Sequence, residues 1–251
     1  MSRTYRFMIA DVFTSVPFTG NQLGVFTNAT GLSDAEMQML ARELNFSECT
    51  FVLPPEGDAD IRMRIFTPAH ELPFAGHPTL GTAFVMAGPL QKIVLRIETT
   101  AGVVPVTLDR EGARIVFGWM DQPIPMLGPV ADPTPLFAAL GVSGSALPVE
   151  RYDNGVVHLL VTLETDAEVA ALKPDLRALA EAAGVAGVSC FAASGTRVKT
   201  RMFAPELGVG EDPATGSAAG PLAVHLARHG RIAWGEEIEI SGRIDRLVVD
   251  T

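Results

Sequence analysis

The chain contains two hydrophobic patterns, one typical of helices and one typical of strands. Residues 32–44 carry apolar side chains three or four positions apart, which predicts an amphipathic helix capped by Ser33 or Asp34. Residues 61–65 alternate apolar positions with arginines, which predicts a strand with one face in the core and one in water. These two elements lie close together in the first half of the chain.

The same order of patterns returns in the second half. Residues 172–184 predict a second helix, and residues 198–203 predict a strand that corresponds to residues 61–65. Each of these strands leads into a loop rich in glycine and proline and then into an apolar helix, predicted over 79–87 and 218–229. The chain therefore reads as two copies of one unit, each with several strands, a peripheral helix and a buried central helix.

A proline-rich segment, residues 122–129, follows a series of predicted hairpin strands and is the best candidate for a domain boundary. We expect an N-terminal half over residues 1–121, completed by a C-terminal strand at about residues 242–251. The C-terminal half is then expected over residues 122–241.

Composition narrows the class of protein. Hydrophobic residues make up 47% and charged residues 19% of the 251 positions, which excludes intrinsic disorder and allows a sizeable core. The formal net charge of −10 disfavours nucleic acid as a partner. No apolar run is long enough to span a membrane and the first residues form no apolar signal core, so we expect a cytoplasmic protein.

Two related loops offer candidate chemistry. His77 and Asp212 each precede a proline, which predicts that both residues are helix N-caps. A helix N-terminus carries partial positive charge, so two such ends facing one cleft would bind a small carboxylate. The glycines that would let the ligand approach are Gly76, Gly81, Gly210 and Gly216. The alternative is that Asp212 only caps its helix and His77 only stabilises a turn.

Glu48 is the candidate proton carrier. It lies beside Phe46, Cys49 and Phe51, and an apolar surrounding would raise the pKa of its carboxyl toward the range useful for proton transfer. The alternative is a solvated glutamate at the start of a strand. The matching stretch of the second half, residues 185–190, contains no acid or base, which favours one proton-carrying carboxylate over two matched bases.

Asn21 and the two cysteines give weaker signals. Asn21 follows a glycine at the start of an apolar strand, so it serves either turn formation or substrate contact. Cys49 and Cys190 are too few for a disulfide framework and lie in apolar stretches, as buried thiols do. No cysteine or histidine cluster has metal-ligand spacing, so no metal site is expected.

The motifs together resemble the phenazine biosynthesis PhzF-like family, whose relatives include diaminopimelate epimerase. The resemblance rests on four segments, in the family's order: residues 18–21, 45–48, 66–79 and 211–217. It implies an α+β fold of two pseudo-symmetric halves, each a β-barrel-like sheet around a central helix, with the active site between the halves. It also implies an isomerase that transfers a proton without a cofactor, and relatives of this kind are commonly homodimers.

The resemblance further implies roles for individual residues. Glu48 matches the catalytic acid/base, and His77, Asp212 and Ser217 match residues that line the site and hold the substrate. The resemblance thus implies that Glu48, His77 and Asp212 are catalytic and that Ser217 binds substrate. With Asn21, Gly76 and Gly216 they form the expected site. The epimerase relatives carry cysteines at the positions of His77 and Asp212, so a racemase with two thiols is disfavoured here.

These observations lead to one hypothesis and two alternatives. We expect a phenazine biosynthesis-like, cofactor-independent isomerase that moves a proton within a small carboxylate-bearing substrate. An amino-acid racemase or epimerase is the second enzyme class. A non-catalytic protein that binds small molecules on the same scaffold is the third possibility.

Overall fold

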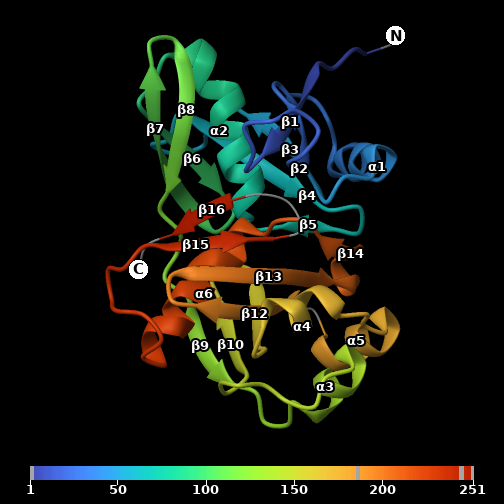
Figure 1. Ribbon diagram of the computed structural model, residues 1–251. Helices are drawn as coiled ribbons and strands as arrows, with labels where there is room; N and C mark the ends of the chain where they lie inside the picture. Colours follow the sequence, from blue (N-terminus) through green and yellow to red (C-terminus); the bar gives the residue numbers. More distant parts are fainter. Residues whose placement is uncertain (1–2, 185–186, 243–245, 250–251) are drawn as a thin grey trace. The chain divides into compact units, whose positions relative to one another are not determined.

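We describe the protein from a computed structural model, which covers residues 3–184, 187–242 and 246–249 in detail (Figure 1). The chain divides into two compact units. The first contains the chain up to Val12 together with Asn21–Gln122, and the second contains Phe13–Gly20 and the chain from Pro123 onward. The division after Gln122 falls within the proline-rich segment of the sequence.

The first unit is a mixed sheet with two helices. Its strand order is β1-β2-β3-β4-β6-β7-β8, and β5 pairs with β4. The elements are β1 (Phe7–Val12), β2 (Asn21–Phe26), α1 (Asp34–Leu44), β3 (Glu48–Leu53), β4 (Ile61–Phe66), β5 (Glu71–Leu72), α2 (Gly76–Leu90), β6 (Val94–Thr99), β7 (Gly102–Glu111) and β8 (Arg114–Met120).

The second unit is built in the same way. Its strand order is β16-β15-β13-β12-β11-β10-β9, and β14 pairs with β13. The elements are β9 (Met126–Pro129), α3 (Thr134–Leu140), β10 (Glu150–Asp153), β11 (Val157–Thr162), α4 (Asp166–Ala171), α5 (Leu176–Ala183), β12 (Gly187–Ser194), β13 (Arg197–Ala204), the short 3-10 helix η1 (Pro205–Leu207), β14 (Val209–Asp212), α6 (Gly216–Arg228), β15 (Ile238–Ser241) and β16 (Arg246–Val249).

Strand pairing confirms that the chain contains one unit twice. In the first unit β2 pairs parallel with β3, β3 antiparallel with β4, and β4 parallel with β6. In the second unit β11 pairs parallel with β12, β12 antiparallel with β13, and β13 parallel with β15. The helical crossovers that parallel pairs require also correspond, because α1 and α4–α5 connect the first parallel pair while α2 and α6 connect the second.

The central helix of the first unit explains the curvature of its sheet. Helix α2 contacts β1, β2, β3, β6, β7 and β8, which are strands at both ends of the sheet as well as in its middle (Figure 1). A sheet that contacts one helix along nearly its whole width must curl around that helix. This is the β-barrel-like half that the sequence predicts, and the fold class is α+β.

Helix boundaries differ from the sequence expectation at one peripheral helix. The predicted helix over 172–184 begins at Leu176, where the side chain of Asp175 caps the helix by accepting hydrogen bonds from two backbone amides. A separate short helix, α4, precedes it and is capped by Thr165. By contrast, α1 begins as expected, with Ser33 in a capping box with Glu36.

The C-terminal strand also differs from the expected domain organisation. The described part of this segment, β16, pairs antiparallel with β15 in the second sheet, whereas the sequence expectation places residues 242–251 with the N-terminal half. A short connection joins the two strands, and consecutive strands joined in this way tend to pair with each other. Residues 243–245 and 250–251 lie outside the described residues.

Helix α2 approaches its sheet unusually closely at Gly81. A Cβ atom at this position would lie 2.6 Å from Cδ2 of Leu23 and 2.7 Å from Cγ2 of Val12. Both neighbours are buried, so neither side chain has room to move aside.

No helix among the described residues is long and apolar enough to cross a membrane.

We predict that Gly81→Val lowers the free energy of unfolding by about 2 kcal/mol or more, because overpacking a dense core forces side chains and backbone to shift. Gly144→Val is the matched control, since a Cβ there meets nothing within 4 Å. The control is expected to change stability by less than about 0.5 kcal/mol. Urea unfolding of both variants measures the difference, and equal stabilities would contradict the close approach of α2.

Candidate active site

Glu48 is the first residue of strand β3. The parallel pairing of β3 with β2 places Glu48 opposite Leu23. Its side chain is only 13% exposed, and its Oε2 atom lies 3.2 Å from Nδ1 of His77. The carboxylate is therefore held against a buried imidazole, which differs from the solvated glutamate that the sequence left as an alternative.

His77 is the second residue of α2, and its ring is almost completely buried. Burial lowers the pKa of this histidine to about 3, against the opposing effect of a hydrogen bond with the backbone of Gln22. The ring is therefore neutral near pH 7. A neutral ring in contact with Glu48 does not cancel the charge of the carboxylate.

Asn21 completes this group of side chains from the start of β2. Its Nδ2 atom lies 3.4 Å from the same Nδ1 atom of His77, and Asn21 is itself buried. A neutral imidazole nitrogen either donates or accepts a hydrogen bond, according to the tautomer. Nδ1 of His77 can thus donate to ionised Glu48 when it carries the proton, or accept one hydrogen bond, from Asn21 or from protonated Glu48, when it does not. The ring suits both protonation states of the carboxyl group.

The segment that carries His77 is tied to the strand that carries Glu48. The hydroxyl groups of Thr50 in β3 and Thr82 in α2 form a buried hydrogen bond of 2.8 Å. Near the N-terminus of the same helix, Thr79 donates to the backbone oxygen of Ala75. These contacts hold the start of α2 in a fixed position relative to β3.

In the second unit, the expected residues gather where β14 leads into α6. Asp212 is buried at the end of β14 and accepts a 2.5 Å hydrogen bond from the hydroxyl of Thr215, the N-cap residue of α6. Gly216 and Ser217 are the first two residues of this helix. The backbone oxygen of Ser217 accepts a 2.8 Å hydrogen bond from the buried side chain of Asn154.

The prediction that His77 and Asp212 are N-caps is wrong. The N-cap of α2 is Ala75, so His77 lies inside the first turn, and Asp212 lies in a strand three residues before the N-cap of α6. Proline is tolerated throughout the first turn of a helix as well as in loops, so a proline does not fix the first helical residue. By position in their helices, His77 and Ser217 are the second residues of α2 and α6.

Two ion pairs, one in each unit, lie beside the loops that lead into α2 and α6. The sequence analysis did not predict them. Arg64 binds Glu71 through two hydrogen bonds of 2.7 and 2.6 Å, and Arg201 binds Glu211 through two of 2.8 and 2.9 Å. Each arginine also stacks over a phenylalanine two residues later in its own strand. The repeated Arg-x-Phe pattern in β4 and β13 was the available signal, since it stands at matching positions of the two copies.

Both cysteines are buried, and burial raises the pKa of Cys49 and of Cys190 to about 12. A thiol acts as a base or nucleophile only as its thiolate, which these groups do not form near neutral pH. Neither residue is therefore suited to the proton transfer of a two-thiol racemase.

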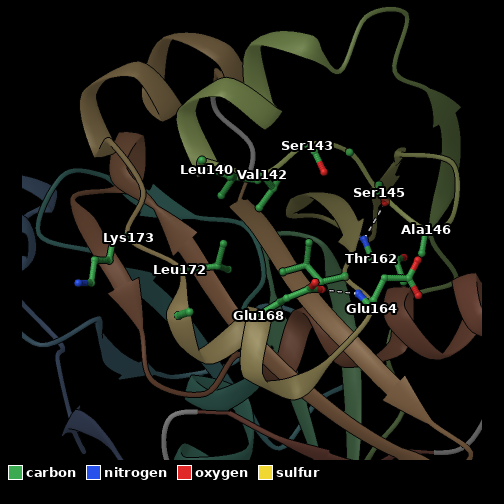
Figure 2. Close-up of a pocket in the computed structure, with 14 residues that line it drawn as sticks. Leu140, Val142, Ser143, Ser145, Ala146, Thr162, Glu164, Glu168, Leu172 and Lys173 are labelled. Atoms are coloured by element: carbon green, nitrogen blue, oxygen red, sulfur yellow. Dashed lines mark hydrogen bonds between the residues drawn. The ribbon is translucent and has the colours of Figure 1, made fainter.

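The second unit also contains an open cavity of about 640 Å³ between α3 and α4 (Figure 2). Two hydrogen bonds cross its lining, from the backbone amide of Thr162 to Ser145 and from that of Glu164 to Glu168. Its described lining residues include none of the expected site residues. This cavity is therefore separate from the groups with suitable chemistry.

Comparison with known proteins identifies the family. The model of the phenazine biosynthesis-like protein family matches residues 10–245. The chain belongs to this family. Trans-2,3-dihydro-3-hydroxyanthranilate isomerase of Pseudomonas aeruginosa is 50% identical over 236 residues, which are 94% of this chain and 84% of that protein. The enzyme of the same name from Pseudomonas chlororaphis is 48% identical over the same shares. This PhzF-family chain is accordingly an isomerase.

Solved structures agree with this assignment. A protein from Pseudomonas aeruginosa described as a predicted epimerase has a TM-score of 0.86 at 32% identity, over 98% of this chain and 92% of that one. A PhzF-family protein from Bacillus anthracis has a TM-score of 0.81 at 28% identity, over 96% and 88%. A probable proline racemase from Agrobacterium radiobacter, with a TM-score of 0.67 at 16% identity over 97% and 83%, shows the shared fold alone.

We predict that His77 stays neutral down to about pH 5. The unfolded chain binds the proton below its ordinary pKa of about 6.5 whereas the folded chain does not, so the free energy of unfolding falls as pH drops below 6.5. Imidazole nitrogen NMR shifts between pH 5 and 8 measure this, with the His77→Gln spectrum as the assignment control. A resonance missing from that variant and titrating near pH 6.5 in the wild type would contradict the buried, neutral ring.

Proposed function

We propose that this PhzF-family isomerase moves a proton between two carbons of a small cyclic carboxylate, with Glu48 as the proton carrier. The observation that carries this proposal is the contact between the Glu48 carboxylate and the neutral ring of His77, at 3.2 Å within a buried environment. The identity of 50% to isomerases of trans-2,3-dihydro-3-hydroxyanthranilate supports a substrate of that class, a ring that bears carboxylate, amino and hydroxyl groups.

The proposed reaction needs one acid/base group. Ionised Glu48 takes a proton from a ring carbon, and the electron pair left behind delocalises into the conjugated ring and the substrate carboxylate. Protonated Glu48 then returns the proton to a different carbon of the same conjugated system, so no oxidant, reductant or second base is required. His77 accommodates both states of Glu48, because its Nδ1 atom can donate to the carboxylate or accept from the acid.

The remaining expected residues hold the substrate in this proposal. Gly76 and Gly216 begin the two central helices, whose N-terminal ends carry partial positive charge. In the described part of the chain, neither helix has a side-chain hydrogen bond at its N-cap or an acidic residue in its first turn. Ser217 and Asn21 supply polar side chains for an anion, and Asp212 accepts a hydrogen bond from an amino or hydroxyl group of the substrate.

The two alternative functions are distinguished by isotope exchange. In heavy water an isomerase and a racemase both incorporate deuterium at carbon, whereas a binding protein does not. Chiral analysis of the product then separates the two enzymes. The high thiol pKa values and the positions of the two cysteines favour the isomerase over a thiol-based racemase.

We predict that Glu48→Gln lowers kcat at least about 10³-fold on trans-2,3-dihydro-3-hydroxyanthranilate while substrate Kd changes only a few-fold. The amide keeps the size and hydrogen-bonding reach of the acid but cannot carry the proton, and general acid/base groups contribute about 10²–10⁴-fold. Cys49→Ser is the matched control at the next residue of β3 and should retain turnover. Wild-type turnover in Glu48→Gln would disprove a one-carboxylate mechanism.

Two further variants separate binding from chemistry. Ser217→Ala should mainly weaken binding, since a hydroxyl at a helix N-terminus contacts the anion in ground and transition states alike. Asp212→Asn should reduce both kcat and affinity to an intermediate degree, because the amide keeps an acceptor oxygen but loses the charge. Calorimetry gives Kd, and a steady-state assay gives kcat. A loss of turnover in Ser217→Ala with unchanged Kd would reassign Ser217 to the chemical step.

We further propose a cytoplasmic homodimer. In the first sheet β8 is an edge strand, and its residues Val116, Phe117 and Trp119 are each more than one third exposed. Phe117 and Trp119 also pack against each other, with ring centroids 5.0 Å apart. Adjacent exposed aromatic side chains on a sheet edge are typical of a surface that a partner covers.

We predict a mass near twice 26.6 kDa in light scattering at micromolar concentration. Burying adjacent apolar side chains of two copies would provide the free energy for association. A mass near 26.6 kDa at the same concentration would refute the homodimer.

A further inference from the structure

A second group of polar side chains lies in the second unit, between β10 and the C-terminal half of α6. It consists of Glu150 from β10, His225 from α6 and His229, the C-cap residue of α6, and we call it the Glu150 cluster. The histidines are four residues apart on the helix, so both project from one face. Glu150 is 75 residues before His225 in the chain, and the fold brings them together.

The ligand-type atoms of this cluster converge on one oxygen. Glu150 Oε2 lies 3.1 Å from Nδ1 of His225 and 3.0 Å from Nε2 of His229. The hydroxyl of Tyr152 donates to the same oxygen at 2.7 Å and also lies 3.0 Å from Nδ1 of His225. The ligand atoms of Glu150, His225 and His229 all lie within 4.8 Å of one another.

More groups approach Glu150 Oε2 than its lone pairs readily accept as hydrogen-bond donors. One carboxylate oxygen offers about two lone-pair directions, yet three groups approach Glu150 Oε2 within 3.1 Å. Tyr152 donates its proton to Glu150, and the tautomer of His225 decides whether Nδ1 donates to these oxygens or presents a lone pair. A small cation that shares the lone pairs of these atoms would satisfy all of them together.

Two of the three ligand–ligand distances fit a tetrahedral transition-metal ion. With metal–ligand distances of about 2.0–2.2 Å, two ligand atoms of such an ion lie about 3.3 Å apart. Both distances from Glu150 Oε2 to the histidine nitrogens are within about 0.3 Å of that value. The three protein ligands leave a fourth position, which a water molecule or the Tyr152 hydroxyl would fill.

The charge of the Glu150 cluster and its exposure to solvent are both compatible with a bound cation. Glu150 supplies a carboxylate as the anionic ligand of the cluster. Arg228 approaches the other oxygen, Oε1, at 3.5 Å and leaves Oε2 to the histidines. His229 is 21% and Glu150 18% exposed, which gives an ion a path from solvent.

We propose that the Glu150 cluster is a binding site for a divalent transition-metal ion of the Zn²⁺ type, held by Glu150, His225 and His229. Two imidazoles and one carboxylate form a donor set that suits Zn²⁺ and disfavours Mg²⁺ or Ca²⁺, which prefer oxygen ligands. The ion would fasten the C-terminal half of α6 to β10. It lies about two helical turns, some 12 Å along the helix axis, from Ser217 and takes no part in the isomerisation.

This site was invisible to the sequence reasoning, which predicts no metal. His225 and His229 are four residues apart, which by itself does not define a metal site, and the third ligand comes from a different strand far away in the chain. Only the pairing of β10 and the packing of α6 place Glu150 beside them.

The test uses the full-length chain, stripped of metal with a chelator and dialysed. Calorimetric titration with Zn²⁺ should show one ion per chain with micromolar or tighter Kd, and Mg²⁺ should not compete. Cobalt(II) titration should give the visible absorption of a four- or five-coordinate ion without a thiolate charge-transfer band. Zn²⁺ at a hundredfold excess over Kd should raise Tm by about 5 °C or more.

Variants connect the binding to these residues. Glu150→Gln and His229→Gln should each weaken Zn²⁺ affinity at least tenfold. His70→Gln changes an exposed histidine of the first unit and should leave affinity unchanged. His229 is partly exposed, so its variant remains folded, which circular dichroism without metal verifies. No Zn²⁺ binding at 100 µM, or equal affinity in wild type and His229→Gln, would overturn the proposal and leave the cluster as a hydrogen-bond network.

Discussion

The close packing of α2 against its sheet is the constraint on which the first unit depends. The helix touches strands from both ends of the sheet, and Gly81 gives the clearance that Val12 and Leu23 need. This proximity buries the start of the helix and so removes His77 from water. The low pKa of that ring and its contact with Glu48 are consequences of the packing, because an exposed imidazole would be partly protonated near neutral pH.

The two copies share their framework more closely than their chemistry. Strand pairing, helical crossovers and the paired ion pairs Arg64–Glu71 and Arg201–Glu211 recur. Glu48 has no counterpart in the second copy, because β3 begins with this acid whereas the matching strand β12 begins with Gly187. The second copy instead contributes Asp212 and the start of α6, which suit binding more than proton transfer. The two copies thus differ in the side chains at these positions although their framework recurs.

Periodicity predicted the elements whose faces differ most in polarity. Strand β4 alternates apolar residues with arginines, and α1 has both an apolar stripe and a capping box, so both were located within a few residues. Prolines misled the prediction of helix starts at residues 77 and 212, because proline fits several positions near a helix end. The helix predicted over residues 172–184 begins only at Leu176, because the side chain of Asp175 caps its N-terminus. Glu48 and His77 were candidates from their motifs, but their contact at 3.2 Å depends on packing that no local pattern encodes.

The assignment of Phe13–Gly20 to the second unit has a consequence for how this chain can be divided. The backbone passes from one unit to the other after Val12, returns after Gly20, and passes over again after Gln122. Dividing the chain once, in the proline-rich segment, would therefore leave residues 13–20 of the second unit attached to the first. The duplicated halves are alike in architecture, but they are not exchangeable modules. Recombination that swaps one half between relatives would have to carry the eight residues 13–20 along with the second half.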